Sequence, residues 1–143
     1  MATIRILGAG ESDVLANVAA DVFDNAVDPR WTAEFLNDSR HHLAVAVEDG
    51  QVVGMASAVH YVHPDKPPEL WINEVAVAPE HRRRGLGRRL LAALFARGRA
   101  LGCRQAWVAT EPANTAARRL YAAAGGEESP VPFLMVEFDL KPE

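Results

Sequence analysis

The chain has 143 residues, of which 49% are hydrophobic and 24% charged; this length and composition fit one globular domain and exclude two. It contains neither an apolar run long enough to span a membrane nor the apolar core of a signal peptide, so we expect a cytoplasmic protein with no membrane partner. Cys103 is the single cysteine, which excludes an internal disulfide and predicts a buried, structural thiol.

In chain order, hydrophobic periodicity and turn residues predict one mixed α/β domain over residues 1–143. The expected strands cover residues 3–7, 43–48, 51–61, 69–77, 105–110 and 133–140. The expected helices cover residues 11–23, 30–36, 85–101 and 114–124. Asp49-Gly50 predicts a tight antiparallel hairpin between the second and third strands. Three prolines within residues 64–68 require a loop before the fourth strand.

Charge is unevenly distributed, although the net charge is only −4. Residues 79–104 contain eight arginines and one acidic residue, whereas residues 1–40 contain seven acidic residues and three arginines. A basic region suits an anionic cofactor and an acidic region suits a cationic substrate, provided that folding brings the two to one cleft.

The most informative motif is the arginine-rich turn between the strand at 69–77 and the helix at 85–101. Arg82, Gly85 and Gly87 fill the pattern Arg-x-x-Gly-x-Gly. Backbone N–H groups at a helix N-terminus favour an anion, and glycine lets the backbone approach it closely. A P-loop is absent, and a dinucleotide fingerprint would need a third glycine in place of Leu90. The turn therefore predicts a ligand that carries phosphate, bound at a strand-to-helix crossover.

Two ordered blocks of sequence extend this motif. Residues 73–91 (NEVAVAPEHRRRGLGRRLL) resemble the acetyl-coenzyme A signature of the GCN5-related N-acetyltransferase (GNAT) family, and residues 114–126 are similar to that family's penultimate helix and following turn. The resemblance implies a single-domain GNAT fold with a mostly antiparallel central sheet, helices on both faces, and a splayed parallel pair of strands that binds acetyl-coenzyme A. It also implies direct transfer of an acetyl group to a primary amine in a ternary complex.

The resemblance implies two groups of cofactor-binding residues. The pyrophosphate is expected to bind the turn and the start of its helix, at Arg82, Arg83, Arg84, Gly85, Leu86, Gly87 and Arg88. The pantetheine arm is expected to pair with the backbone of Val75, Ala76 and Val77 and to contact Asn114.

Acetyl transfer also needs a base for the amine and an acid for the thiolate. Glu74 is the candidate base, and because an ordinary glutamate pKa near 4.3 makes a weak base, partial burial or an intervening water is required. Glu137 and Asp139 are weaker alternatives. Tyr121 is the candidate acid, since it lies on the same helix face as Asn114 and its hydroxyl can protonate a thiolate. The structural alternatives are an exposed or salt-bridged Glu74 and a Tyr121 packed in the core.

Acidic residues outside the arginine turn predict a small polycationic acceptor, such as a polyamine or an aminoglycoside. The candidate acceptor-binding residues are Asp24, Asp28, Glu34, Glu69 and Asp139. An ordinary solvated helix face is the alternative explanation for this charge. Residues 21–29, 49–54 and 136–140 resemble aminoglycoside 3-N-acetyltransferases, although Glu74 replaces the aspartate that this branch tends to carry.

Two other functions remain open: a protein N-terminal or lysine acetyltransferase, and a noncatalytic acyl-coenzyme A-binding module, which the presence of Glu74 and Tyr121 disfavours. No metal is expected, because the four histidines at 41, 42, 60 and 63 lack a recognisable ligand spacing. No nucleic-acid partner is expected, since the net charge is negative and stacking aromatics are missing. A homodimer is compatible with the sequence.

Overall fold

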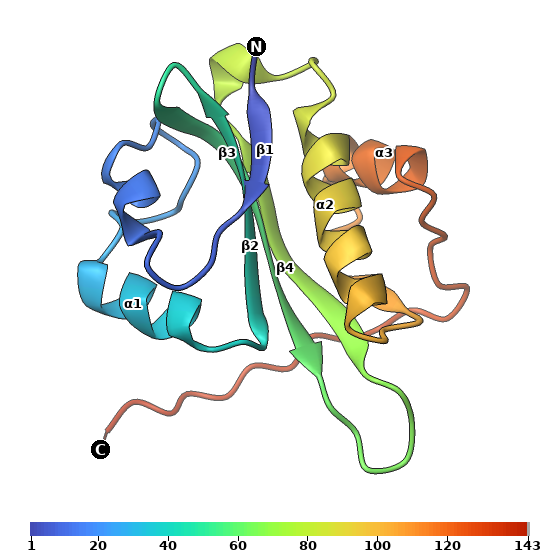
Figure 1. Ribbon diagram of the computed structural model, residues 1–143. Coiled ribbons are helices and arrows are strands. Elements are labelled where there is room, and N and C mark those ends of the chain that lie inside the picture. Colours follow the sequence, from blue (N-terminus) through green and yellow to red (C-terminus); the bar gives the residue numbers. More distant parts are fainter. Residues whose placement is uncertain (143) are drawn as a thin grey trace.

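The computed structural model describes residues 1–142 and contains a five-stranded sheet with helices on both faces (Figure 1). The strands are β1 (Thr3–Ile6), β2 (His41–Glu48), β3 (Gln51–Tyr61), β4 (Glu69–Val77) and β5 (Ala106–Val108). They lie in this order across the sheet, antiparallel from β1 to β4, with β5 parallel to β4. This arrangement confirms the mixed α/β fold expected from the sequence.

The helices are α1 (Pro29–Asn37), α2 (Leu86–Ala100) and α3 (Thr115–Ala123), with two short 3-10 turns, η1 (Ser12–Ala16) and η2 (Pro79–His81). Figure 1 shows α1 on one face of the sheet and α2 with α3 on the other. None of the helices within residues 1–142 has the length and hydropathy needed to span a bilayer.

Local sequence determines where these elements begin and turn. Asp28 caps α1 by accepting hydrogen bonds from the backbone N–H groups of Arg30 (2.8 Å) and Trp31 (3.2 Å). Asp49 and Gly50 both adopt positive φ (51° and 74°), as a two-residue hairpin of type I′ requires, so the predicted β2–β3 hairpin is confirmed.

The core lies between β2, β3, β4 and α2. Residues 43–46 and 52–58 of the two central strands are buried almost without interruption, because helices cover both faces of the sheet. From α2, Leu90, Leu91 and Leu94 contribute fully buried side chains. The predicted burial of Cys103 is confirmed.

The helix predicted over residues 11–23 is wrong beyond the short turn η1. Asn17 is extended, Val18 forms a parallel bridge with Val52, and Ala19 donates its N–H to the carbonyl of Val52 (2.8 Å). The backbone of this segment therefore satisfies its hydrogen bonds at the hairpin end of β3, and its apolar residues face the core without helical repetition.

The strand predicted over residues 133–140 does not form within this chain. These residues are extended but pair with no strand, and they run from α3 past the lower end of the sheet to its opposite side (Figure 1). The strand predicted over 105–110 is shortened to Ala106–Val108.

Candidate functional site

The two parallel strands separate near the middle of the sheet. β4 pairs with β5 only through Leu70, Trp71 and Ile72. On the other side of β4, Ser57 lies opposite Glu74 but Ala58 lies opposite Ile72, which leaves Asn73 as an extra residue in a bulge. A bulge bends its strand and re-aims the neighbouring side chains. From Asn73 onward, no strand within residues 1–142 pairs with the β5-facing edge of β4. This agrees with the splayed pair that the family resemblance implies.

The arginine turn connects this diverging end of β4 to α2. Arg82 donates from Nε to the carbonyl of Val77 (3.1 Å), while Arg83 and Gly85 adopt positive φ (65° and 74°). The N-cap residue Gly85 has no side chain to bond the first turn of α2, and the first backward helical bond comes from the N–H of Arg89 to Gly85. The three N–H groups before Arg89 are thus oriented along the helix axis at its positive end, an arrangement suited to an anion.

The predicted arginines differ in their surroundings. Arg83 and Arg88 are exposed. Arg84 turns towards β2, where its Nη1 lies 3.4 Å from Oε2 of Glu48. The N-terminal ammonium (3.3 Å) and His81 (2.8 Å) also contact Glu48. A hydrogen bond from the ammonium is the main cause that lowers the pKa of Glu48. Glu48 therefore links the arginine turn to the central hairpin, a positioning role that sequence spacing did not reveal.

Gly87 has a packing role that the sequence analysis also missed. A Cβ at this position would lie 3.1 Å from both Cδ atoms of Leu120 on α3, closer than ordinary contact. Glycine thus allows α3 to pack directly against the first turn of α2, and Tyr121 follows Leu120 along the same helix. This contact links the start of α2, next to the arginine turn, to α3.

Glu74 lies directly after the bulge. Its side chain is exposed at the residue level, yet partial burial of the carboxyl group raises its pKa, and the negative charge of Asp24 adds to this effect. Asp24 belongs to the segment before α1, so folding brings one of the predicted acceptor-binding acids close to the predicted base. A raised pKa makes Glu74 a stronger base than an ordinary surface glutamate.

Tyr121 and Asn114 belong to α3. Tyr121 is half-buried against the core, and burial raises the pKa of its hydroxyl, which keeps it protonated as an acid requires. Asn114 is the N-cap of α3, where its Oδ1 accepts a hydrogen bond from the N–H of Ala117 (3.0 Å). The capping bond explains why asparagine begins this helix and leaves the side-chain amide NH₂ for other contacts.

Three of the other predicted acceptor-binding acids lie on different elements from Glu74. Asp28 caps α1, and Glu34 is exposed on the same helix. Asp139 lies in the extended C-terminal segment and accepts a hydrogen bond from the N–H of Lys141 (2.8 Å). These contacts give Asp28 and Asp139 local roles, and the assignment of these three acids to acceptor binding stays a prediction.

Glu69 is also separate from Glu74, since the two residues are five positions, or about 17 Å, apart along β4. Its carboxylate accepts a hydrogen bond from Nε1 of Trp107 (2.6 Å) and lies 3.0 Å from Nε2 of His63. These contacts lower the pKa of Glu69, with the Trp107 hydrogen bond as the main cause. Glu69 thus ties the 63–68 loop to β5.

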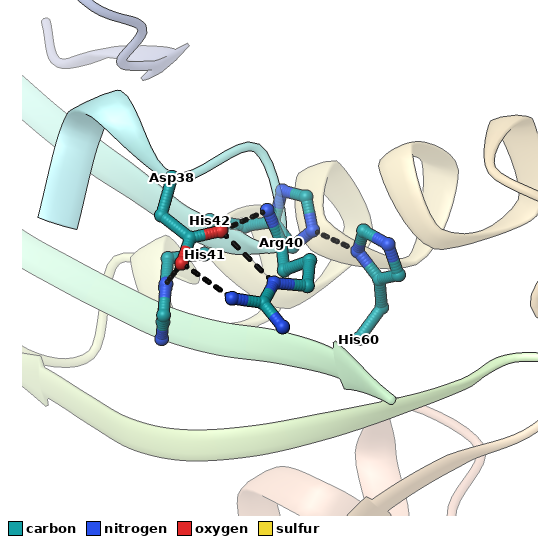
Figure 2. Close-up of polar contacts among 5 residues, drawn as sticks. All are labelled: Asp38, Arg40, His41, His42 and His60. Atoms are coloured by element: carbon teal, nitrogen blue, oxygen red, sulfur yellow. Dashed lines mark hydrogen bonds and ion pairs between the residues drawn. The ribbon is translucent and has the colours of Figure 1, made fainter. Parts of the chain in front are cut away.

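Two of the histidines, the buried His42 and the partly buried His60, form a pair, shown in Figure 2. Nε2 of His42 lies 2.8 Å from Nδ1 of His60, and the two rings are stacked. Burial and the neighbouring His60 lower the pKa of His42 to about 4. Asp38 bonds Arg40 and His41 beside this pair, but within residues 1–142 no group of three ligands is arranged to hold a metal. The pair is a neutral structural contact between β2 and β3.

Comparison with known proteins identifies the family. Residues 13–125 match the sequence profile of the acetyltransferase (GNAT) family. The chain therefore belongs to the GNAT family of acetyltransferases, as the resemblance of its arginine turn implied.

Individual relatives share this core. The chain is 35% identical over 94 residues to aminoglycoside N(6')-acetyltransferase type 1 of Salmonella typhimurium (strain LT2), a match that covers 62% of this chain and 65% of that enzyme. It is 35% identical over 77 residues to L-2,4-diaminobutyric acid acetyltransferase of Virgibacillus pantothenticus, covering 54% of this chain and 47% of that enzyme. The matched Salmonella enzyme is a 6'-N enzyme, whereas the sequence analysis pointed to 3-N enzymes.

Solved structures agree over nearly the whole length. The aminoglycoside acetyltransferase AAC(6')-Iy, in complex with the bisubstrate analogue CoA-S-monomethyl-acetylneamine, superposes with a TM-score of 0.77 at 25% identity, covering 96% of this chain and 99% of that one. An aminoglycoside acetyltransferase from an uncultured soil metagenomic sample has a TM-score of 0.78 at 24% identity, covering 96% and 99%.

Proposed function

We propose that the protein transfers the acetyl group of acetyl-coenzyme A directly to a primary amine of a small polycationic acceptor, such as an aminoglycoside. One observation carries the proposal: Glu74, with a raised pKa, lies where β4 parts from β5 and beside the charge of Asp24. Membership of the GNAT family supports acetyl transfer, and the similarity to AAC(6') enzymes supports the acceptor class.

The residues present fit the donor. The unpaired edge of β4 at Val75, Ala76 and Val77 offers backbone groups for the amides of pantetheine, although the carbonyl of Val77 is already bonded to Arg82. The N–H groups at the start of α2, with the exposed arginines of the turn, would hold the pyrophosphate. Acetyl-coenzyme A supplies the activated acetyl thioester.

Proton transfer is assigned to two side chains. Glu74 accepts a proton from the substrate ammonium, directly or through one water, which frees the nitrogen lone pair. The C–N bond forms as the C–S bond breaks, and the hydroxyl of Tyr121 donates a proton to the departing thiolate. The second proton of the attacking nitrogen then passes to the tyrosinate, directly or through one water, which leaves a neutral amide and restores the Tyr121 hydroxyl. Because burial raises the pKa of Tyr121, this hydroxyl holds its proton until the thiolate develops.

Binding of a cationic acceptor would also lower the pKa of Glu74. The carboxylates of Asp24 and Glu74 repel one another, and this repulsion contributes to the raised pKa of Glu74. An acceptor with several ammonium groups relieves the repulsion when it binds, so the negative form of Glu74 is stabilised as the amine arrives. An acceptor with a single positive charge provides less of this relief.

The experiment is to measure coenzyme A release from acetyl-coenzyme A with panels of aminoglycosides, polyamines and peptides. Saturable release with aminoglycosides supports the proposal. Release with peptides alone would identify a protein acetyltransferase instead, and acetyl-coenzyme A binding without release for any amine would identify a noncatalytic binding module.

A matched pair of variants tests the base. Glu74→Gln should lower kcat by about 100- to 10,000-fold, the usual contribution of a general base. Glu127→Gln, which changes an exposed carboxylate after α3, should leave kcat unchanged. Equal activity of the two variants would remove Glu74 from the mechanism.

A further inference from the structure

A single polar side chain lies in the apolar centre of β3. Residues 52–58 of this strand read VVGMASA, and Ser57, the one polar residue of the run, is only 9% exposed. Within residues 1–142 its hydroxyl makes no hydrogen bond to another protein group, yet it is not among the side-chain atoms that are sealed from solvent. Because buried hydroxyls are as a rule hydrogen-bonded, this one needs a partner from outside the chain.

Ser57 and Glu74 lie side by side on one face of the sheet. They are directly opposite each other in the β3–β4 ladder, and residues opposed in this way have Cβ atoms about 4.5–5.5 Å apart. A Cβ on Gly54 would lie 3.3 Å from Cδ1 of Leu90, so Gly54 faces α2. Ser57, three residues further along the strand, therefore points to the opposite face, deep beside the exposed Glu74.

The bulge in β4 opens the ladder at this point. Asn73 has no cross-strand partner on β3, so regular ladder bonding is interrupted next to the pair of Ser57 and Glu74. An ordered water in a protein interior makes about three hydrogen bonds to polar groups. A water on the Ser57 hydroxyl would find further partners in the Glu74 carboxylate and in the backbone groups that the bulge leaves unpaired.

The depth of Ser57 favours water as its partner. Glu74 is exposed, whereas Ser57 is nine-tenths buried, so an acceptor ammonium that binds the carboxylate lies further out than the hydroxyl. Burial and the charge of Asp24 are the causes that raise the pKa of Glu74, and no hydrogen bond from Ser57 contributes. A bridging water costs little and is nearly as good as a direct hydrogen bond. One such molecule can bond the hydroxyl, the carboxylate and the ammonium together.

We propose that Ser57 is a positioning residue, which holds the water through which Glu74 takes a proton from the acceptor. The water gives one proton to a carboxylate oxygen of Glu74 as it takes one from the ammonium, so the nitrogen gains its lone pair and the water is unchanged overall. The Ser57 oxygen keeps this molecule oriented between the two groups. The inference rests on the proposed function and specifies that the base acts through water.

The experiment combines kinetics with thermal unfolding. Coenzyme A release is measured with kanamycin or, where kanamycin is not acetylated, with the best acceptor of the amine panel. Ser57→Ala should lower kcat by about 10- to 100-fold. The KM for acetyl-coenzyme A and the melting temperature should stay at the wild-type values, because no hydrogen bond within the protein is lost. The matched control Ser39→Ala removes an exposed hydroxyl before β2 and should change none of these quantities.

A double variant separates positioning from packing. Because Ser57 acts through Glu74, the chain with both Ser57→Ala and Glu74→Gln should turn over about as slowly as Glu74→Gln alone. Losses that multiply, an unchanged kcat in Ser57→Ala, or a lowered melting temperature of Ser57→Ala would overturn the role of Ser57 and leave the proposed function in place. No coenzyme A release by the wild type with any amine of the panel would overturn both.

Discussion

Residues 1–100 and residues 101–142 are packed very differently. The first region contributes every buried hydrophobic residue of the core except Cys103. Its four strands and α2 pack closely against one another. The second region consists of β5, α3 and the extended segment, and α3 contains no buried residue. The first region thus has a continuous hydrophobic core, whereas the second leaves much of its apolar surface exposed.

The candidate site lies across this division. Glu74 and the arginine turn belong to the well-packed region, while Tyr121 and Asn114 belong to α3. The contact between Gly87 and Leu120 joins the two parts. Regions with few buried contacts open at low free energy. We therefore infer that Glu74 and the arginine turn are rigidly placed, whereas the position of Tyr121 depends on the packing of α3.

The largest expected effect compares core substitutions in the two regions. Leu90 is fully buried and lies against Gly54, so Leu90→Ala should lower the free energy of unfolding by about 3–5 kcal/mol. Leu120 on α3 is only partly buried, and Leu120→Ala should cost about 1–2 kcal/mol. Urea unfolding of both variants measures this difference. Equal losses would show that the two regions are packed alike in solution.

The histidine pair makes the well-packed region sensitive to acid. The pKa of His42 is about 4 in the folded protein, against 6.5 when it is free in the unfolded chain, so the unfolded state binds the proton first as the pH falls. The contribution of neutral His42 to the free energy of unfolding is complete above pH 6.5 and is lost as the pH falls through 4. The loss is at most about 3 kcal/mol. Urea unfolding at pH 7 and pH 4.5 measures it. His42→Gln, which does not titrate, should flatten the dependence, and an unchanged slope would contradict the assignment.

Tyr121 tests the less packed region. Tyr121→Phe removes the hydroxyl but keeps the ring against the core, so kcat should fall by about 10- to 100-fold with little change in acetyl-coenzyme A affinity. The matched control is Tyr61→Phe, at the exposed end of β3. Steady-state kinetics and calorimetry provide the two readouts. Unchanged turnover in Tyr121→Phe would leave the tyrosine with a packing role alone.

Secondary structure could be predicted from the sequence where local composition and turn residues agree with the tertiary packing. β3 and β4 were predicted residue for residue, because strand composition and the Asp49-Gly50 turn point the same way. The prediction is wrong over residues 11–23, where the backbone bonds to Val52 instead of forming a helix, and over 133–140, where the extended segment pairs with no strand.

Within the site, the arginine turn could be predicted because its glycines and arginines are local. The contacts of Glu48, the packing of Leu120 on Gly87 and the proximity of Asp24 to Glu74 could not, since each joins residues more than 30 positions apart.

The charge of Asp24 provides the smallest and sharpest test of the site. A general base must be deprotonated, so kcat/KM should rise with pH through the pKa of Glu74. Burial is the main cause of its raised pKa and Asp24 is the second, so Asp24→Asn should shift this rise to lower pH without removing the contribution of burial. Glu127→Gln changes an exposed acid after α3 and should leave the profile in place. If Asp24→Asn leaves the rise unmoved while Glu74→Gln abolishes turnover, Glu74 is still the base but the acidic segment before α1 does not tune it.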